Sequence, residues 1–380
     1  MNDKQDLDET LALVAQAVAD FAKPDAARAR AARDAADGCD AAAWEGMAEQ
    51  GWLAVLLPES LGGTALGMRA AALIAERLGY AGHSEPFVAT AVMAATALLR
   101  CPAGPCRDTL LEGLVRGRCV ALAWQPPLGA LSPAATAVTA REERSGLALS
   151  GVARFVVPAQ AGQYLVAARM DGRMLLCAVD ADASGLSMVK ERTADGGLSL
   201  RLDFDRVVVE RSAILAQGDA AESAVQSAIE SGVLCTAAEL LGAITRMLEV
   251  TQTYLCERQQ FGQHIGAFQV LQHRLVDMWM QKELTRAAVG AAVTAFDAAA
   301  DAPGPLPDAC VAAASSAKAR ASEAALFVTG QAVQLHGAIG TTDEYELGVY
   351  VNRSLTLAAA LGNAAFHRSR FGALVAVEER

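Results

Sequence analysis

The sequence lacks the features that mark a membrane, secreted or metal-binding protein. It contains no run of about 20 uninterrupted apolar residues, which argues against a transmembrane helix. The segment Met1–Asp6 has no basic region followed by an apolar one, so we expect no secretory signal. The eight cysteines form no CxxC pair and the five histidines form no HExxH cluster. We therefore expect a cytoplasmic protein with reduced thiols, no metal site and no association with a membrane.

Positively charged residues are also fewer than negatively charged ones. The 380-residue chain has 32 Lys and Arg against 43 Asp and Glu, which gives a formal net charge of −11. A chain this acidic has no broad basic surface, so we exclude nucleic acid as a partner. The net charge leaves room for a locally basic pocket that binds an anionic cofactor. The length is enough for two or three domains with a large core.

The spacing of apolar residues divides the chain into three parts. Residues 1–117 have helical spacing and predict an all-α N-terminal domain. Within it, Pro58 and paired glycines predict an extended segment and a turn, and a later helix is expected to stop at Gly79. Residues 118–215 predict a middle β domain, an antiparallel barrel or sandwich, because short strands follow one another without intervening helices. The expected strands are 147–151, 154–157, 164–169, 174–179, 198–204 and 207–209.

Residues 221–380 return to helical spacing and predict a C-terminal four-helix bundle. We expect long helices at about 221–257 and 268–299. The proline-rich loop 301–308 separates them from a third helix, for which Asp308 is the expected N-cap. A fourth helix is expected after a turn at 337–342. The fold class is therefore α+β.

Two segments near the C-terminus carry chemistry. They are Glu257–Gly266, which reads ERQQFGQHIG, and Gln334–Gly340, which reads QLHGAIG. In the first, Arg258 can offer a charge and Phe261 a flat wall, as the pyrophosphate and adenine of a dinucleotide require. Each signal is weak alone, since Arg at a helix end often only complements the helix dipole and His336 reads as a buried core residue. No GxGxxG follows a strand, so a Rossmann cradle is absent.

In combination, these segments resemble the flavin-binding signature of the acyl-CoA dehydrogenase family. The resemblance spans nearly the whole chain. Gly51–Gly63 resembles the family's N-terminal helical domain, and Phe204–Val209 resembles the end of its middle domain. Leu271–Arg274 and Leu335–Gly337 resemble the small subunits of bacterial heteromeric members, of the pimeloyl-CoA dehydrogenase or steroid-side-chain type.

The resemblance implies an FAD-dependent oxidoreductase of fatty acid or lipid metabolism that desaturates an acyl-CoA thioester and passes electrons to an electron-transferring flavoprotein. It implies a homo- or hetero-oligomer, usually a tetramer built as a dimer of dimers, because the family's contacts reach a neighbouring subunit's flavin. The cofactor-binding positions that it carries over are Arg258, Gln260, Phe261, Gln334, Gly337, Ala338 and Asn363. Ala338 stands where the family has a second glycine, and Asn363 where it has a threonine.

The family removes the proton α to the thioester with a carboxylate, while the flavin takes a hydride from the β carbon. Counting without gaps from Gln334 puts the common base position at Leu361. The rarer position lies 26 residues before Arg258, at Gly232. Neither residue can abstract a proton. Glu230 and Glu239 are nearby, and a solvated or ion-paired role is the commoner one for such residues.

The segments that would face the flavin ring also depart from the family. Ala123–Ala130 reads AWQPPLGA where the family usually has Thr-Glu-Pro and then Gly-Ser-Asp. Phe155–Pro158 reads FVVP where the family usually has Trp-Ile-Thr-Asn or Trp-Ile-Ser-Gly. Hydroxyl donors to the ring are thus missing, whereas the side that would hold a neighbour's ADP moiety is largely kept.

Three hypotheses follow. The first is the base-lacking subunit of an α2β2-type acyl-CoA dehydrogenase, which completes the FAD site of a partner chain. The second is a competent homotetramer with a displaced base, Glu239 or Glu230. The third is a flavin-free structural or acyl-CoA-binding protein.

Overall fold

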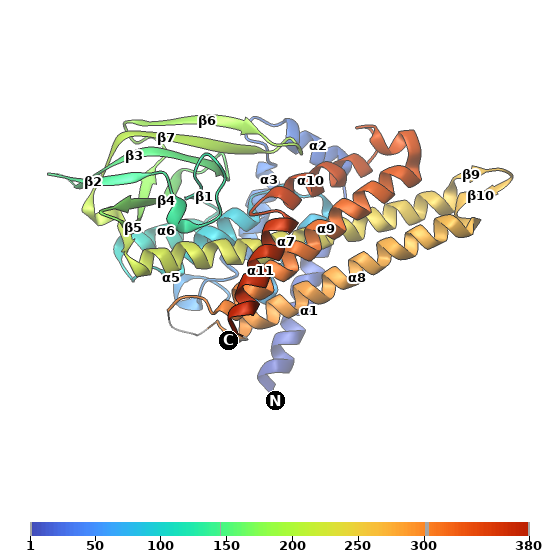
Figure 1. The fold of residues 1–380 in the computed structure, drawn as a ribbon, viewed down its shortest axis with the longest axis horizontal. Helices are drawn as coiled ribbons and strands as arrows, with labels where there is room; N and C mark the ends of the chain where they lie inside the picture. Colours follow the sequence, from blue (N-terminus) through green and yellow to red (C-terminus); the bar gives the residue numbers. More distant parts are fainter. Residues whose placement is uncertain (1, 145, 301–303, 379–380) are drawn as a thin grey trace.

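The chain folds into a helical N-terminal part, a central β-sheet and a C-terminal bundle of long helices (Figure 1). The computed structural model describes residues 2–144, 146–300 and 304–378. The α+β class predicted from the sequence is confirmed. In the described ranges no helix is both long and apolar enough to span a bilayer, and no cluster of His, Cys, Asp or Glu could hold a metal ion.

Short helices build the N-terminal part, and aspartates begin two of them. Asp25 and Asp40 each accept hydrogen bonds from two backbone N–H groups of the following turn, as N-cap residues do. The expected extended segment near Pro58 is wrong, because two 3-10 turns, Trp52–Ala54 and Glu59–Leu61, occupy it. The helices are α1 (Asn2–Phe21), α2 (Ala26–Asp34), α3 (Ala41–Glu49), α4 (Gly67–Ala81), a π-helical segment (Val88–Ala94), α5 (Ala95–Arg100) and α6 (Pro105–Val115).

Helix α4 runs past the predicted stop at Gly79 and ends at Ala81, where the C-cap Gly82, with a φ of 72°, closes the last turn. Gly79 has a different role inside the helix. A Cβ there would lie 2.1 Å from the backbone oxygen of Glu239, so only glycine allows α4 to approach the long helix behind it so closely.

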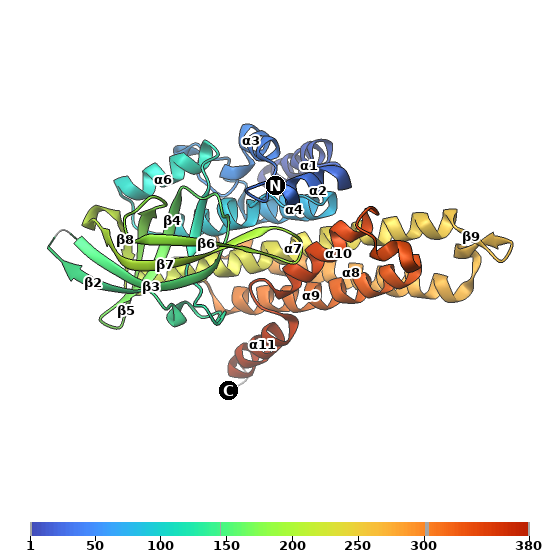
Figure 2. The same cartoon turned by 90° about the horizontal axis from the view of Figure 1, so that it is seen from above.

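The central sheet has eight strands in the order β6-β7-β3-β2-β4-β5-β8, with β1 paired to β4 (Figure 2). Its pairs are antiparallel except for β1 with β4 and a short contact of β2 with β4. The strands are β1 (Val120–Ala123), β2 (Thr139–Glu143), β3 (Gly146–Val156), β4 (Gln163–Met170), β5 (Arg173–Asp180), β6 (Leu186–Arg192), β7 (Leu198–Val209) and β8 (Ile214–Gln217).

The sequence pattern missed four of these strands and divided two others. The expected strands 147–151 and 154–157 form the single strand β3, and 198–204 and 207–209 form β7, because bulges interrupt the pattern without ending the pairing. Strand β6 was missed since it lies at the sheet edge with most side chains exposed, which removes the alternation. Strands β1, β2 and β8 have only four or five residues each.

The C-terminal bundle surrounds α7 (Asp219–Glu257), a helix of 39 residues that is buried on nearly all sides in its middle. The other helices are α8 (Gln269–Ala298), α9 (Asp308–His336), α10 (Leu347–Ala359) and α11 (Ala364–Glu378). The hairpin β9–β10 (Gln259–Gln260 and Gln263–His264) joins α7 to α8 at the far end of the bundle (Figure 1).

Two details of the bundle differ from the prediction. Asp308 is the first residue of α9 and not its N-cap, which is Pro307. The expected fourth helix is two helices, because the chain breaks at Leu361 and Gly362, both with positive φ. Of the predicted loop 301–308, residues 301–303 lie outside the described residues.

Glycine substitutions test how closely α4 and α7 are packed. A Cβ at Gly242 would lie 1.9 Å from the backbone oxygen of Glu76 in α4, whereas one at Gly290, in the middle of α8, would meet no atom within 4 Å. We expect Gly242→Ala to lower the free energy of unfolding by about 3 kcal/mol. Gly290→Ala should raise it by up to about 1 kcal/mol through helix propensity. Urea unfolding measures both, and equal effects would contradict the close crossing.

Candidate cofactor and catalytic sites

Arg258 ends α7 with its side chain free. Its backbone N–H donates to Tyr254 O at 2.9 Å, and its carbonyl accepts from Ile265 N at 2.8 Å, so the main chain is fixed. No hydrogen bond or ion pair engages the exposed guanidinium within the described part of the chain. A guanidinium with spare N–H donors is suited to a phosphate group.

Phe261 and Gly262 form the tip of the hairpin that follows. Their φ values of 56° and 81° are those that a two-residue hairpin turn requires. The Phe261 side chain is 92% exposed and meets only the edge of Phe268, with ring centroids 6.2 Å apart. Gln260 lies beside it, and its amide donates to Gln259 O at 2.7 Å. The hairpin therefore presents an aromatic face and amide groups outward.

The end of α9 lies next to the end of α7. Tyr254 stacks on His336 with ring centroids 4.4 Å apart, and its hydroxyl donates to His336 O at 3.3 Å. His336 is buried with its ring nitrogen Nδ1 2.8 Å from Ala332 O, and burial lowers its pKa. It is the core residue that the sequence indicated. The contact brings Gln334 and Gly337 to the same end of the bundle as the α7 terminus.

Gly337 gives this end an open backbone surface. Its φ of 66° and ψ of −143° are accessible only to glycine, and a Cβ there would meet nothing within 4 Å. Ala338 follows in a 3-10 turn, and its carbonyl accepts from Thr341 Oγ1 at 2.9 Å. A free guanidinium, an exposed aromatic ring and an unobstructed glycine fit the pyrophosphate and adenosine half of FAD. We name this end of the bundle the ADP end.

Asn363 does not lie at the ADP end. Its Oδ1 accepts from Phe366 N at 2.9 Å, so the side chain caps the first turn of α11. The neighbouring Leu361 contacts the position of Gly232 in α7, and 26 residues of α7 separate Gly232 from Arg258. At 1.5 Å per residue this is about 39 Å along the helix axis. One chain thus carries two separated groups of predicted site residues.

The two positions at which the family places a base meet in space. A Cβ at Gly232 would lie 3.1 Å from Leu361 Cδ1 and 2.7 Å from both Cγ and Sδ of Met93. Counting along the sequence had assigned these positions from separate motifs, and the fold brings them together. The three atoms nearest to this Cβ position belong to the apolar side chains of Met93 and Leu361.

Glu239 and Glu230 are buried, and each is held by an arginine. Glu239, 5% exposed, accepts from Arg353 Nε at 2.8 Å, and Glu230, fully buried, accepts from Arg370 Nη1 at 3.0 Å. Burial raises the pKa of both carboxyls, and the arginines oppose that shift. Gln226 also donates to Glu230. These ion pairs link α7 to α10 and α11, as structural carboxylates do.

The two segments that the resemblance assigns to the flavin ring lie together, and Leu131, next to the first of them, packs on Gly362 of the Leu361 turn. Gln125 donates to Gly129 O at 3.0 Å, and a Cβ at Gly129 would lie 3.6 Å from the ring of Phe155. Phe155 is 44% exposed at a φ of 57°, with the guanidinium of Arg154 above its ring. An aromatic surface survives here, but these segments offer no hydroxyl group to a flavin ring.

Lys318 is a feature that the sequence did not reveal. Its ammonium is fully buried and donates to Ser322 Oγ, Ala358 O and Gly362 O at 3.0, 3.3 and 2.8 Å. His367 Nε2 lies 2.8 Å from Leu361 O, so two side chains hold the turn between α10 and α11. Burial lowers the pKa of Lys318 to about 7 and that of His367 to about 4. A lone lysine in an alanine-rich helix has no signal that distinguishes it from a solvated one.

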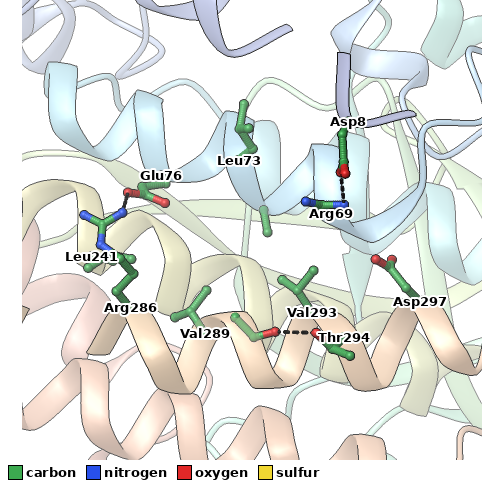
Figure 3. Close-up of a pocket in the computed structure, with 12 residues that line it drawn as sticks. Asp8, Arg69, Leu73, Glu76, Leu241, Arg286, Val289, Val293, Thr294 and Asp297 are labelled. Atoms are coloured by element: carbon green, nitrogen blue, oxygen red, sulfur yellow. Dashed lines mark hydrogen bonds and ion pairs between the residues drawn. The ribbon is translucent and has the colours of Figure 1, made fainter. Parts of the chain in front are cut away.

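A cavity lies elsewhere in the fold. It has a volume of about 760 Å³ and runs between α1, α4, α7 and α8 (Figure 3). Its floor is apolar, and ion pairs close both ends, Asp8 with Arg69 at 2.8 Å and Glu76 with Arg286 at 3.4 Å. None of the predicted site residues lines it.

Comparison with known proteins gives consistent matches. The model of the acyl-CoA dehydrogenase N-terminal domain matches residues 8–118, and that of the acyl-CoA dehydrogenase C-terminal domain matches residues 223–375. Acyl-CoA dehydrogenase IpdE2 of Mycobacterium tuberculosis is 30% identical over 93% of this chain and 91% of its own length.

Solved structures agree with these matches. A variant of the Tcur3481-Tcur3483 steroid ACAD is 30% identical with a TM-score of 0.85, and the match covers 99% of both chains. The ChsE4-ChsE5 complex of Mycobacterium tuberculosis has a TM-score of 0.84 at 24% identity, over 98% of this chain and 96% of that chain, and shows the fold.

The buried lysine gives a pH dependence with a definite sign. The folded pKa of Lys318 is about 7, against an ordinary value of 10.5 in the unfolded chain, so the unfolded state binds more protons between these pH values. Relative to Lys318→Met, the wild-type protein should gain stability as pH rises from 7 to 10, by up to about 1.4 kcal/mol per pH unit.

Urea unfolding at several pH values measures this difference. The matched control is Lys190→Met, because Lys190 is exposed and pairs with Asp37 at the surface. A difference between wild type and Lys318→Met that stays flat with pH would contradict the shifted pKa.

Proposed function

Because the chain belongs to the acyl-CoA dehydrogenase family, we propose that it is the base-lacking subunit of a heteromeric, α2β2-type acyl-CoA dehydrogenase. One observation carries the proposal. Both positions where the family keeps a catalytic carboxylate, Gly232 and Leu361, meet in an apolar contact. Removal of the α proton requires a base beside the substrate, so that base comes from a partner chain.

The separation of the two groups of site residues supports a role across an interface. The ADP end keeps the free Arg258, the exposed Phe261 and the open Gly337. It lies about 39 Å along α7 from the Leu361 turn, farther than one extended FAD reaches. The ADP end of this chain therefore completes the FAD site of a neighbouring chain. When bound there, FAD supplies the hydride acceptor for desaturation of an acyl-CoA thioester.

An oligomer is supported by apolar side chains left on the bundle surface. Helices α8 and α9 leave large apolar side chains exposed to solvent. They are Trp279, Met280 and Leu284 of α8 and Leu326 and Phe327 of α9. Exposed apolar side chains gathered on one surface are typical of an interface with another chain. The name of each of the two solved structures described above joins two protein names. We propose a dimer of dimers with unlike chains, a role in lipid metabolism, and an electron-transferring flavoprotein as electron acceptor.

The chain purified alone gives the first test. We expect its visible spectrum to show no flavin that bleaches when a panel of acyl-CoAs is added, because no base lies at Gly232 or Leu361. Bleaching at ordinary enzyme rates would overturn the proposal. Loss of that bleaching in Glu239→Gln or Glu230→Gln, with flavin still bound, would then establish the homotetramer with a displaced base.

The second test uses the heteromer purified with its base-carrying partner chain. Arg258→Ala removes the free guanidinium from the ADP end, so we expect FAD to bind about 10- to 100-fold more weakly, as loss of a charge-assisted contact predicts. Flavin absorbance after gel filtration and a titration with FAD measure the loss. Arg206→Ala, at an exposed arginine paired with Glu143, is the control and should keep full flavin content. Unchanged FAD affinity in Arg258→Ala would contradict the role of the ADP end.

A further inference from the structure

Gly232 lies in the most deeply buried part of α7 and leaves space for a side chain from another element. Every residue from Ala228 to Ala243 is buried, and within this stretch Gly232 and Gly242 have no side chain. The space is not empty. The thioether of Met93 occupies it, since a Cβ at Gly232 would lie 2.7 Å from both Cγ and Sδ of that residue. The side chain of Met93 therefore packs into the space beside Gly232 on the surface of α7.

An irregular helix places Met93 there. Val88–Ala94 is a π-helical segment, a rare geometry that often occurs at functional sites. Thr90 Oγ1 in the same segment donates to Val120 O in β1 at 3.2 Å, which holds the segment between the sheet and α7. Methionine is flexible and fills irregular gaps well. With 8% of its surface exposed, Met93 is almost entirely packed.

Leu361 closes the other side of the hole. Its Cδ1 lies 3.1 Å from the Cβ position of Gly232, and its backbone sits at a φ of 52°. Lys318 and His367 hold the surrounding carbonyls, so the turn that carries Leu361 is fixed. Leu131 packs on the next residue, with Cδ1 2.8 Å from the Cβ position of Gly362. The π-helical segment, α7 and the turn between α10 and α11 thus meet at Gly232.

We propose that Met93, seated against Gly232 and covered by Leu361, closes the acyl-binding site of this chain, so that the heteromer takes up acyl-CoA only in its base-carrying subunit. The inference rests on the proposed function, because that assigns the region between the two base positions to the α carbon of a substrate. It adds that this chain lacks room for the acyl group as well as a base. Neither the cavity of Figure 3 nor a smaller one beside Arg353 is lined by Met93 or Leu361.

A double-mutant cycle tests the packing directly. Gly232→Ala places a methyl group against Met93, so it should lower the melting temperature, and Met93→Ala should restore part of that loss in the double variant. Met47→Ala is the matched control, because Met47 is also buried, in α3, but is not among the residues nearest to Gly232. Recovery with Met93→Ala and none with Met47→Ala supports the proposal. Additive losses in both double variants would overturn it.

Xenon tests whether the site is closed. Crystals of the chain under xenon pressure should show no xenon between Gly232 and Leu361 in the wild type, and a bound atom there in Met93→Ala, because a dry apolar cavity of this kind binds xenon. Xenon in the wild type at that place would mean that the site is open. The double-mutant cycle and the xenon experiment require neither flavin nor a partner chain. A negative result in either therefore contradicts the closed site without bearing on the heteromer proposal.

Stoichiometry tests the consequence for binding. An S-alkyl-CoA thioether, matched in length to the best substrate of the acyl-CoA panel, can be titrated into the heteromer by calorimetry. We expect one molecule bound for each pair of unlike chains. Two per pair would overturn the closed site even if the heteromer itself is confirmed.

Discussion

The close crossing of α4 and α7 is the constraint on which the remaining structure depends. Backbone meets backbone there, with Gly242 against Glu76 and Gly79 against Glu239, so neither helix can rotate or slide without a clash. Because α7 is one unbroken helix of 39 residues, fixing its position also fixes both of its ends. The ADP end and the Leu361 turn, which packs on Gly232, are therefore held about 39 Å apart along one rigid element. Under the proposed function, such a chain offers half of a dinucleotide site to a neighbouring chain.

Buried ion pairs attach the outer elements to this helix. Arg353 of α10 binds Glu239 of α7 at 2.6 Å and Asp195 of the β6–β7 hairpin at 2.8 Å, so sheet and bundle share one arginine. Arg370 of α11 holds Glu230 in the same way. Removing one partner of such a pair leaves a buried charge, at a typical cost of about 3–5 kcal/mol. The contacts of Glu239 and Glu230 are those typical of structural carboxylates, and their partners come from α10 and α11.

The packing around Gly232 combines three features that have different causes. Gly232 leaves space beside α7, Met93 of the π-helical segment packs into that space, and Lys318 and His367 hold the turn that brings Leu361 against it. Met93 and Lys318 carry no sequence signal, since one reads as core and the other as a solvated lysine. Their roles depend on burial by residues that lie far away in the chain.

The sequence by itself determined the three parts of the chain, the long helices and the two positions, Gly232 and Leu361, that the resemblance assigns to a base, because helical periodicity and short motifs depend on residues close together. Helix α4 extends beyond its predicted end at Gly79. The sequence does not distinguish a glycine that ends a helix from one that allows a close contact inside it, and only the position of Glu239 shows that Gly79 is of the second kind. The edge strand β6 and the break at Leu361 were likewise set by what packs beside them. Only the tertiary structure decided that Gly232 and Leu361 meet, and that Asn363 caps a helix far from Arg258. Contacts between residues more than a hundred positions apart depend on how helices cross, which local spacing does not encode.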